Sequence, residues 1–119
     1  MKSEHTGIKR ILRAFGYSWN GLVSTFKTEA AFRQDLMLCV GGIALQFFID
    51  VPTLHRIIML FSLTFIILAE LINTALETVI DRIGAEYNPM SGRVKDIGSA
   101  VVMLTIISVV VLWICLIVL

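Results

Sequence analysis

The chain has 119 residues, of which 57% are hydrophobic and only 16% are charged, and 10 Lys and Arg residues against 9 Asp and Glu residues give a net charge of +1. Soluble domains typically carry about 25% charged residues and disordered chains lack apolar ones, so both classes are excluded. At about 20 residues per transmembrane helix, the chain holds at most three or four spans and has no room for a separate soluble catalytic domain. The net charge does not indicate a nucleic-acid partner, and the two cysteines offer no metal framework.

An amphipathic helix is predicted near the amino terminus, over about residues 6–27. Large apolar residues recur there at steps of three and four, which places one side of a helix at Ile8, Ile11, Leu12, Phe15, Trp19, Leu22 and Phe26. Lys9, Arg10 and Arg13 fall on other sides and interrupt the apolar stretch, so we expect no cleavable signal peptide. The apolar stripe and basic flank favour a helix in the membrane interface, and packing against other protein is the alternative.

Two transmembrane helices are predicted next, over residues 29–49 and 53–83. The apolar run 36–49 rises only about 21 Å as a helix, against a hydrocarbon core of about 30 Å, so the first of these helices must begin near Glu29. Pro52 suits the start of the second helix.

A third transmembrane helix is predicted over residues 96–119, since Ile97 to Leu119 contains no charged residue. Residues 84–95 are expected to form a polar loop broken by Gly84, Pro89 and Gly92, after which Asp96 caps or opens the helix.

Positive charge predicts the orientation of this single-domain, all-α membrane protein. Of the ten Lys and Arg residues, only Arg56 lies at the end of the bundle where the first two predicted spans are joined. Because positive residues gather on the cytoplasmic side, the amino terminus is predicted to be cytoplasmic and the carboxyl terminus to lie outside.

A polar stripe on the second predicted span carries the candidate chemistry. Its members follow at steps of 3, 4 and 4, within an arc of about 80° on a helix: Glu70, Asn73, Glu77 and Asp81. With Ile57 at the outer edge, Glu70 would lie about 10 Å inside the cytoplasmic edge and Glu77 close to that edge. Burying an ionised carboxylate is costly, so the stripe indicates a functional site; a buried ion pair that holds helices together is the alternative.

A divalent cation would offset these carboxylates. Mg²⁺ takes one or two carboxylates together with waters and substrate phosphates, which favours phosphoryl transfer. Glu29, at the same predicted depth as Glu77, is a candidate second ligand, and basic anchors for phosphate are available at Arg10, Arg13, Arg93 and Lys95. No Walker, dinucleotide-binding or protein-kinase motif is present, so the familiar nucleotide-binding folds are excluded.

Three segments resemble the signature of the small prokaryotic integral-membrane diacylglycerol kinases: Glu29-Ala-Ala-Phe-Arg-Gln, Glu70-Leu-Ile-Asn-Thr-Ala-Leu-Glu-Thr-Val-Ile-Asp-Arg-Ile and Ser91-Gly-Arg-Val-Lys-Asp-Ile-Gly-Ser-Ala. Gly16-Tyr-Ser-Trp agrees as well, so the resemblance spans the chain. It implies a homotrimeric helical bundle in the bacterial inner membrane, each subunit having an amphipathic surface helix and three transmembrane helices. It also implies transfer of the γ-phosphate of MgATP to the hydroxyl of diacylglycerol, giving phosphatidic acid for phospholipid biosynthesis.

The same resemblance assigns roles to residues. Glu70 matches the general base with Asn73 beside it, and Glu29 and Glu77 match metal-binding carboxylates that also contact the nucleotide. Further ATP contacts are implied at Arg10, Tyr17, Glu86, Tyr87, Asn88, Lys95 and Asp96. Contacts with the lipid substrate are implied at Arg10, Ala14, Phe15, Gly16, Tyr17, Ser18, Trp19, Glu70 and Ser99. Asn88 departs from the family's Glu-Tyr-His run, so it keeps a hydrogen-bonding side chain but cannot carry charge.

Several alternatives stay open at this stage. Within the family, the acceptor could be undecaprenol, although the long amino-terminal helix favours diacylglycerol. From another class, an intramembrane Glu could serve a proton- or cation-translocating subunit, but residues 57–69 offer only Ser62 and Thr64 to continue a polar path. We interpret Arg33 and Asp35 as local interface charges and Trp113 as an interfacial or core anchor. Since three helices enclose little interior, we expect the site to lie between subunits.

Overall fold

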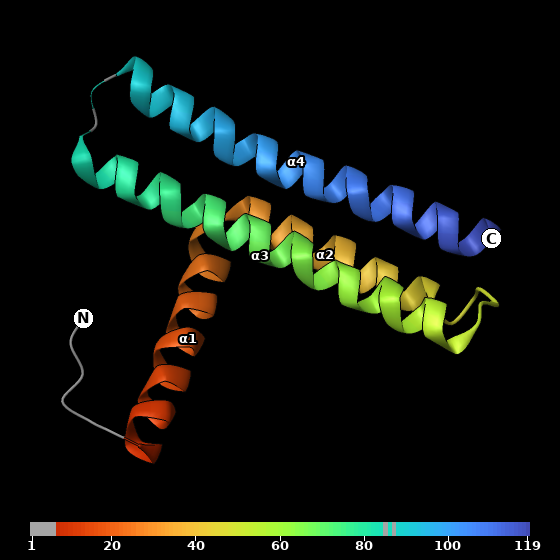
Figure 1. Ribbon diagram of the computed structural model, residues 1–119. Helices are drawn as coiled ribbons and strands as arrows, with labels where there is room; N and C mark the ends of the chain where they lie inside the picture. The colour runs from red at the N-terminus through yellow and green to blue at the C-terminus, as the bar shows by residue number, and fades with distance from the viewer. Residues whose placement is uncertain (1–6, 85, 87) are drawn as a thin grey trace.

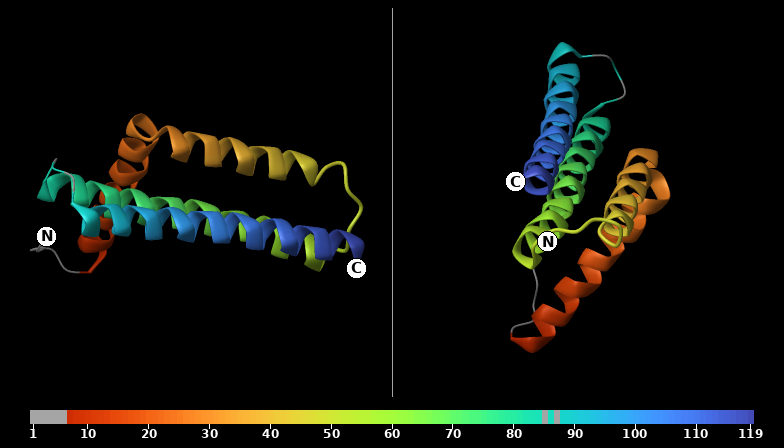
Figure 2. Two further views of the ribbon diagram at one scale, coloured as in Figure 1. Left: turned by 90° about the horizontal axis from the view of Figure 1, so that it is seen from above. Right: turned by 90° about the vertical axis from the view of Figure 1, so that its right-hand side faces the viewer.

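The computed structural model describes residues 7–84, 86 and 88–119, and the regular structure in these residues is entirely α-helical. In chain order the helices are α1 (Ile8–Thr28), α2 (Ala30–Leu45), α3 (Thr53–Ile83) and α4 (Pro89–Val118). α3 is the central helix and packs antiparallel against α2 on one side and α4 on the other, while α1 leaves the start of α2 at a steep angle (Figure 1). In the right-hand view of Figure 2, α4, α3 and α2 lie side by side in one row. The prediction of an all-helical chain is confirmed.

A one-residue elbow at Glu29 separates α1 from α2. Its backbone is extended, with φ −114° and ψ 110°, so it ends α1 and begins α2. The Glu29 N–H donates to the Thr25 carbonyl at 2.9 Å, and the Arg33 guanidinium donates to the carbonyls of Phe26 at 2.6 Å and Lys27 at 3.3 Å. Because these bonds satisfy the last carbonyls of α1, they stabilise the sharp change of direction. Arg33 thus stabilises the elbow, and its interpretation as a membrane-interface charge stays a prediction.

The amphipathic character of α1 is confirmed. Its apolar side chains are largely exposed in this subunit, with Phe15 69% and Trp19 68% exposed. An exposed apolar stripe of this length, flanked by Lys9, Arg10 and Arg13, is what a helix in a membrane interface requires.

α2 is shorter than predicted. It ends at Leu45 rather than continuing to Ile49, and residues 46–48 form a turn. Arg56 of α3 explains this early end, because its guanidinium donates to the Gln46 carbonyl and to the Ile49 carbonyl at 3.0 Å, which draws the chain away from helical geometry. With 16 residues α2 rises about 24 Å. Among the described helices, α3 and α4 are the two that are long and apolar enough to cross a membrane.

The half of the bundle that contains the carboxyl end of α4 packs around Trp113. Its indole N–H donates to Ser62 Oγ at 2.8 Å and to the Met59 carbonyl at 3.2 Å, both on α3. Its ring also lies over Gly42 of α2, where a Cβ would be 3.1 Å from the ring. The surrounding buried cluster is Cys39, Met59, Leu63, Ile66, Val109 and Trp113. The interpretation of Trp113 as a core anchor is confirmed.

α4 begins earlier than predicted, and the expected polar loop over residues 84–95 is wrong for its second half. The helix starts at Pro89, and Asn88 caps it by accepting a hydrogen bond from the Met90 N–H at 2.8 Å. Proline fits the first position of a helix, where its missing N–H costs nothing, so Pro89 starts the helix instead of breaking it. Asp96 therefore neither caps nor opens α4 but lies about two turns inside it.

Candidate functional site

Three polar residues of the predicted stripe form one hydrogen-bonded series on the carboxyl-terminal half of α3. Glu70 is only 4% exposed and Asn73 9% exposed, while Glu77 is half-buried. The Asn73 amide donates to Glu70 Oε2 at 3.4 Å and to Glu77 Oε1 at 3.1 Å. Steps of three and four residues place all three side chains on one face, so a single amide can hold both carboxylates in place. This is the arrangement expected from the helical spacing.

These residues line an open cavity of about 520 Å³ where α3, α4 and the start of α2 meet. The polar part of its wall consists of Glu70, Asn73, Glu77 and Ser99, and the remaining part is formed by Ala31, Val102, Met103, Ile106 and Ile107. The structure thus brings Ser99 to Glu70, as the resemblance implied. A cavity lined by both carboxylates and aliphatic side chains suits a molecule with a polar head and an apolar body.

Asp35, interpreted from the sequence as a local interface charge, lies near Glu70, and this proximity was not predicted. Its side-chain oxygen Oδ2 is buried without a hydrogen-bond partner among the described residues. Comparing distances along the two helices could have predicted the proximity to Glu70. Asp35 lies six residues after Glu29, about 9 Å along a helix, and Glu70 lies seven residues before Glu77, about 10.5 Å along a helix.

The donor chemistry around Glu77 fits Mg²⁺. Mg²⁺ prefers hard oxygen ligands, and besides Glu77 the site contains Asn73 Oδ1, a buried amide oxygen without a hydrogen-bond donor. Glu29 is half-buried at the elbow, two residues before the cavity-lining Ala31. Within the described part of the chain no three His, Cys, Asp or Glu side chains gather closely enough to hold a metal by themselves. Such a small carboxylate set matches an ion that takes most of its ligands from water and phosphate.

A second, smaller cavity of about 300 Å³ lies at the end of the bundle where α3 leads into α4. It brings together three of the predicted nucleotide contacts, Glu86, Asn88 and Lys95. Lys95 Nζ donates to Asp81 Oδ1 at 2.9 Å, and this bond raises the pKa of the exposed Lys95 ammonium. Lys95 is thus positively charged at neutral pH and available to phosphate. Asp96 lies beside Lys95 on α4 and is exposed, and Tyr87 lies outside the described residues.

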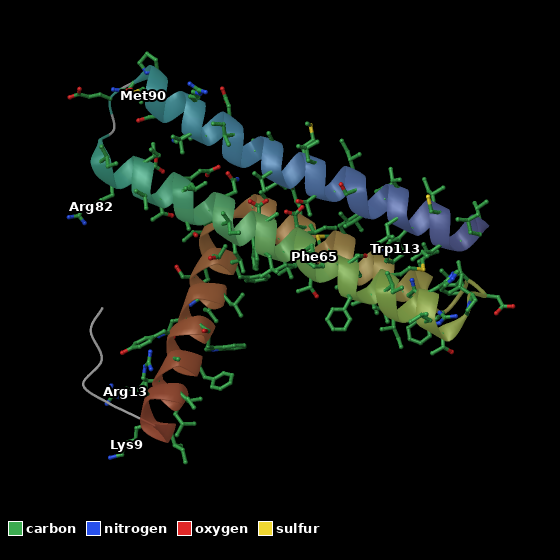
Figure 3. All side chains as sticks on the ribbon, viewed as in Figure 1. Lys9, Arg13, Phe65, Arg82, Met90 and Trp113 are labelled. Carbon is green, nitrogen blue, oxygen red and sulfur yellow. The ribbon has the colours of Figure 1, made fainter. Side chains whose placement is uncertain are left out.

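The predicted site residues of α1 are not joined to either cavity within one subunit. Figure 3 shows Lys9 and Arg13 on the part of α1 that extends away from α3 and α4, while Arg82 and Met90 mark the end near the smaller cavity. Neither cavity is lined by any of the predicted α1 site residues, which are Arg10, Ala14, Phe15, Gly16, Tyr17, Ser18 and Trp19. The single chain therefore supplies the acidic part of the predicted site without its α1 part.

The fold and this cavity define a small all-helical protein with long apolar helices and a carboxylate site between them. A family described as prokaryotic diacylglycerol kinase matches residues 16–117. The diacylglycerol kinase of Escherichia coli K12 is 41% identical over 113 residues, which is 95% of this chain and 93% of that protein. The diacylglycerol kinases of Haemophilus influenzae and Pseudomonas aeruginosa are 41% and 40% identical, over 91% of this chain and 92% and 88% of their own lengths.

The chain belongs to the prokaryotic diacylglycerol kinase family. This membership confirms the resemblance inferred from the sequence motifs around Glu29, Glu70 and Ser91.

Proposed function

We propose that this protein is a diacylglycerol kinase, which transfers the γ-phosphate of ATP to the free hydroxyl of diacylglycerol and releases phosphatidic acid and ADP. The observation that carries the proposal is the buried Glu70–Asn73–Glu77 series, open to a cavity with an apolar wall, in a chain of this family. The reaction takes place at the cytoplasmic face of the bacterial inner membrane, where the lipid and the soluble nucleotide meet.

Glu70 acts as the general base. It is the deepest carboxylate of the stripe and shares its cavity with Ser99 and aliphatic side chains of α4, where the hydroxyl of a membrane-embedded glycerol group can reach it. A Glu70 carboxylate oxygen accepts the hydroxyl proton as the lipid oxygen attacks the γ-phosphorus and the bond to the ADP oxygen breaks. Asn73 orients this carboxylate through its amide N–H.

Glu77 and Glu29 hold the metal of MgATP, and Lys95 binds its phosphates. When bound, Mg²⁺ would neutralise part of the phosphate charge. Phosphoryl transfer with a loose transition state is accelerated mainly by such charge stabilisation and by positioning, and little by covalent catalysis. Lys95 exchanges its surface partner Asp81 for a phosphate oxygen, a small change because the pair is exposed. Glu86, Asn88 and Asp96, near Lys95, complete the nucleotide contacts together with Tyr87.

The active unit is a homotrimer with three transmembrane helices in each subunit. α2 is the third span, because its 16 helical residues and the following turn together cover most of the hydrocarbon core. α1 lies on the cytoplasmic surface, and its Arg10, Tyr17 and 14–19 segment cover a site. Since no α1 residue lines either cavity of its own subunit, this proposal places the cover over a site shared between subunits.

The test is a competition between acceptor lipids. Purified protein in mixed micelles receives labelled ATP, Mg²⁺ and equal amounts of diacylglycerol and undecaprenol, and the labelled lipids are separated. We expect label predominantly in phosphatidic acid. Label predominantly in undecaprenyl phosphate would keep the phosphoryl-transfer chemistry but refute the substrate. With no labelled lipid from folded protein, the kinase assignment fails, and proton or cation flux through reconstituted vesicles would be measured instead.

A further inference from the structure

Gly98 of α4 lies directly against the Asn73 side chain of α3. Gly98 is buried, and a Cβ built at this position would overlap Asn73 Oδ1 and lie 3.2 Å from Asn73 Cγ. The third nearest atom is also part of this side chain, Asn73 Cβ at 3.8 Å. The glycine therefore leaves room for one amide group, and no backbone atom of α3 is among its three nearest neighbours.

The position of this amide decides the geometry of the acidic series. Asn73 Nδ2 reaches Glu77 Oε1 at 3.1 Å and Glu70 Oε2 at a longer 3.4 Å, so a small rotation breaks the Glu70 contact first. An alanine methyl group at residue 98 would push Oδ1 and rotate the amide plane. The side chain is flexible, so the amide can move at low cost to stability while losing its bridging position.

We propose that Gly98 is a positioning residue for phosphoryl transfer, acting through Asn73 to keep the Glu70 and Glu77 carboxylates in register. This inference rests on the proposed kinase function and adds to it a residue of α4 that has no side chain of its own. It explains why a helix with 23 uncharged residues at its carboxyl end has a glycine at the position that contacts Asn73.

The chain offers two matched glycine controls in α2. Gly42 is also tight, since a Cβ there would be 3.1 Å from the Trp113 ring and 3.4 Å from Leu63, but it lies in the core around Trp113, away from the carboxylates. Gly41 has nothing within 4 Å of a built Cβ. The variants Gly98→Ala, Gly42→Ala and Gly41→Ala thus compare crowding at the site, crowding in the core and no crowding within the subunit.

The experiment measures two quantities for each purified variant: kcat for phosphatidic acid formation per folded protein, and the denaturant midpoint of unfolding in micelles. We expect Gly98→Ala to lower kcat about 100-fold, the cost of a catalytic-group displacement of roughly 1 Å, with a smaller loss of stability than Gly42→Ala. Gly42→Ala should lower the midpoint and keep kcat within about threefold of wild type, and Gly41→Ala should change neither quantity.

Coupling to Asn73 is tested in an Asn73→Ala background, where no amide remains to be displaced. There we expect Gly98→Ala to change the residual rate less than about threefold, because coupled residues are non-additive. The proposal is overturned if Gly98→Ala keeps near wild-type kcat, or if it lowers the rate by the same factor with and without Asn73. If Asn73→Ala leaves no measurable rate, the proposal is tested by the kcat values and unfolding midpoints of the three glycine variants alone. If the wild-type protein phosphorylates no lipid, the proposed function is refuted instead. The unfolding midpoints of Gly98→Ala with and without Asn73→Ala then still test the steric contact between the two residues.

Discussion

Replacing Glu70 by glutamine tests the general-base role with little change in shape. In Glu70→Gln, the new amide oxygen can still accept the hydrogen bond that Asn73 Nδ2 gives to Glu70 Oε2. The buried contacts of a residue that is only 4% exposed are thus retained, so the variant should fold. What it loses is an oxygen that can accept a proton.

The expected loss is large and confined to the chemical step. A general base contributes about 10²- to 10⁴-fold to rate, so we predict a fall in kcat of about 10³-fold, equivalent to about 4 kcal/mol at 1.36 kcal/mol for each factor of ten. The KM for MgATP should stay within about threefold, because Glu70 does not contact the nucleotide. Initial rates of phosphatidic acid formation in mixed micelles measure both constants. Asp50→Asn, an exposed carboxylate between α2 and α3, is the control and should keep wild-type rates. A folded Glu70→Gln enzyme with kcat within about tenfold of wild type would refute the base assignment.

Three further predictions follow from the contacts around the two cavities and Trp113. Glu77→Gln should raise the Mg²⁺ concentration for half-maximal rate about tenfold or more, and an unchanged Mg²⁺ titration would remove Glu77 from the metal site. Lys95→Gln should raise the KM for ATP about tenfold, whereas Asp81→Asn, which frees Lys95 from its 2.9 Å partner, should not raise it. Trp113→Phe should cost about 1–3 kcal/mol of stability because it removes the indole donor to Ser62 and Met59, measured by unfolding in micelles against the 68%-exposed Trp19→Phe as control. Equal midpoints for these two tryptophan variants would contradict the role of Trp113 as a core anchor.

The helical spacing predicted the grouping of the site residues on α3 because all of them lie on one helix. Steps of three and four fix which side chains share a face, whatever packs against that face, so the grouping of Glu70, Asn73 and Glu77 needed no tertiary information. The hydrogen-bonded series confirms it. The same local logic placed the end of α3 at Ile83.

Features that depend on contacts between segments were harder to predict. The early end of α2 is caused by Arg56, ten residues after Gln46 in sequence, and no pattern within α2 contains that information. The start of α4 was missed for a local reason, since Pro89 was interpreted as a breaker although Asn88 before it is a good cap. Asp35 was missed because its proximity to Glu70 depends on how α2 and α3 pair in depth.

The position of α1 relative to the rest of the site could not be predicted from the sequence. Arg10, Tyr17 and the residues around Trp19 follow an amphipathic pattern that predicts a surface helix, and the structure confirms the helix. The surface that this helix contacts in a membrane or in an assembly of several chains is not encoded in the periodicity of one chain.

The most direct test of the central claim is the stoichiometry of transfer in a membrane. Purified protein is reconstituted into vesicles that contain dioleoylglycerol, and ADP release and phosphatidic acid are measured together after addition of ATP and Mg²⁺, with the lipid product identified by mass spectrometry. We predict one phosphatidic acid for each ADP, formed by the wild-type protein and not by Glu70→Gln. ADP release without phosphatidic acid, or equal product from the Glu70→Gln enzyme, would contradict phosphoryl transfer to diacylglycerol at the Glu70 site.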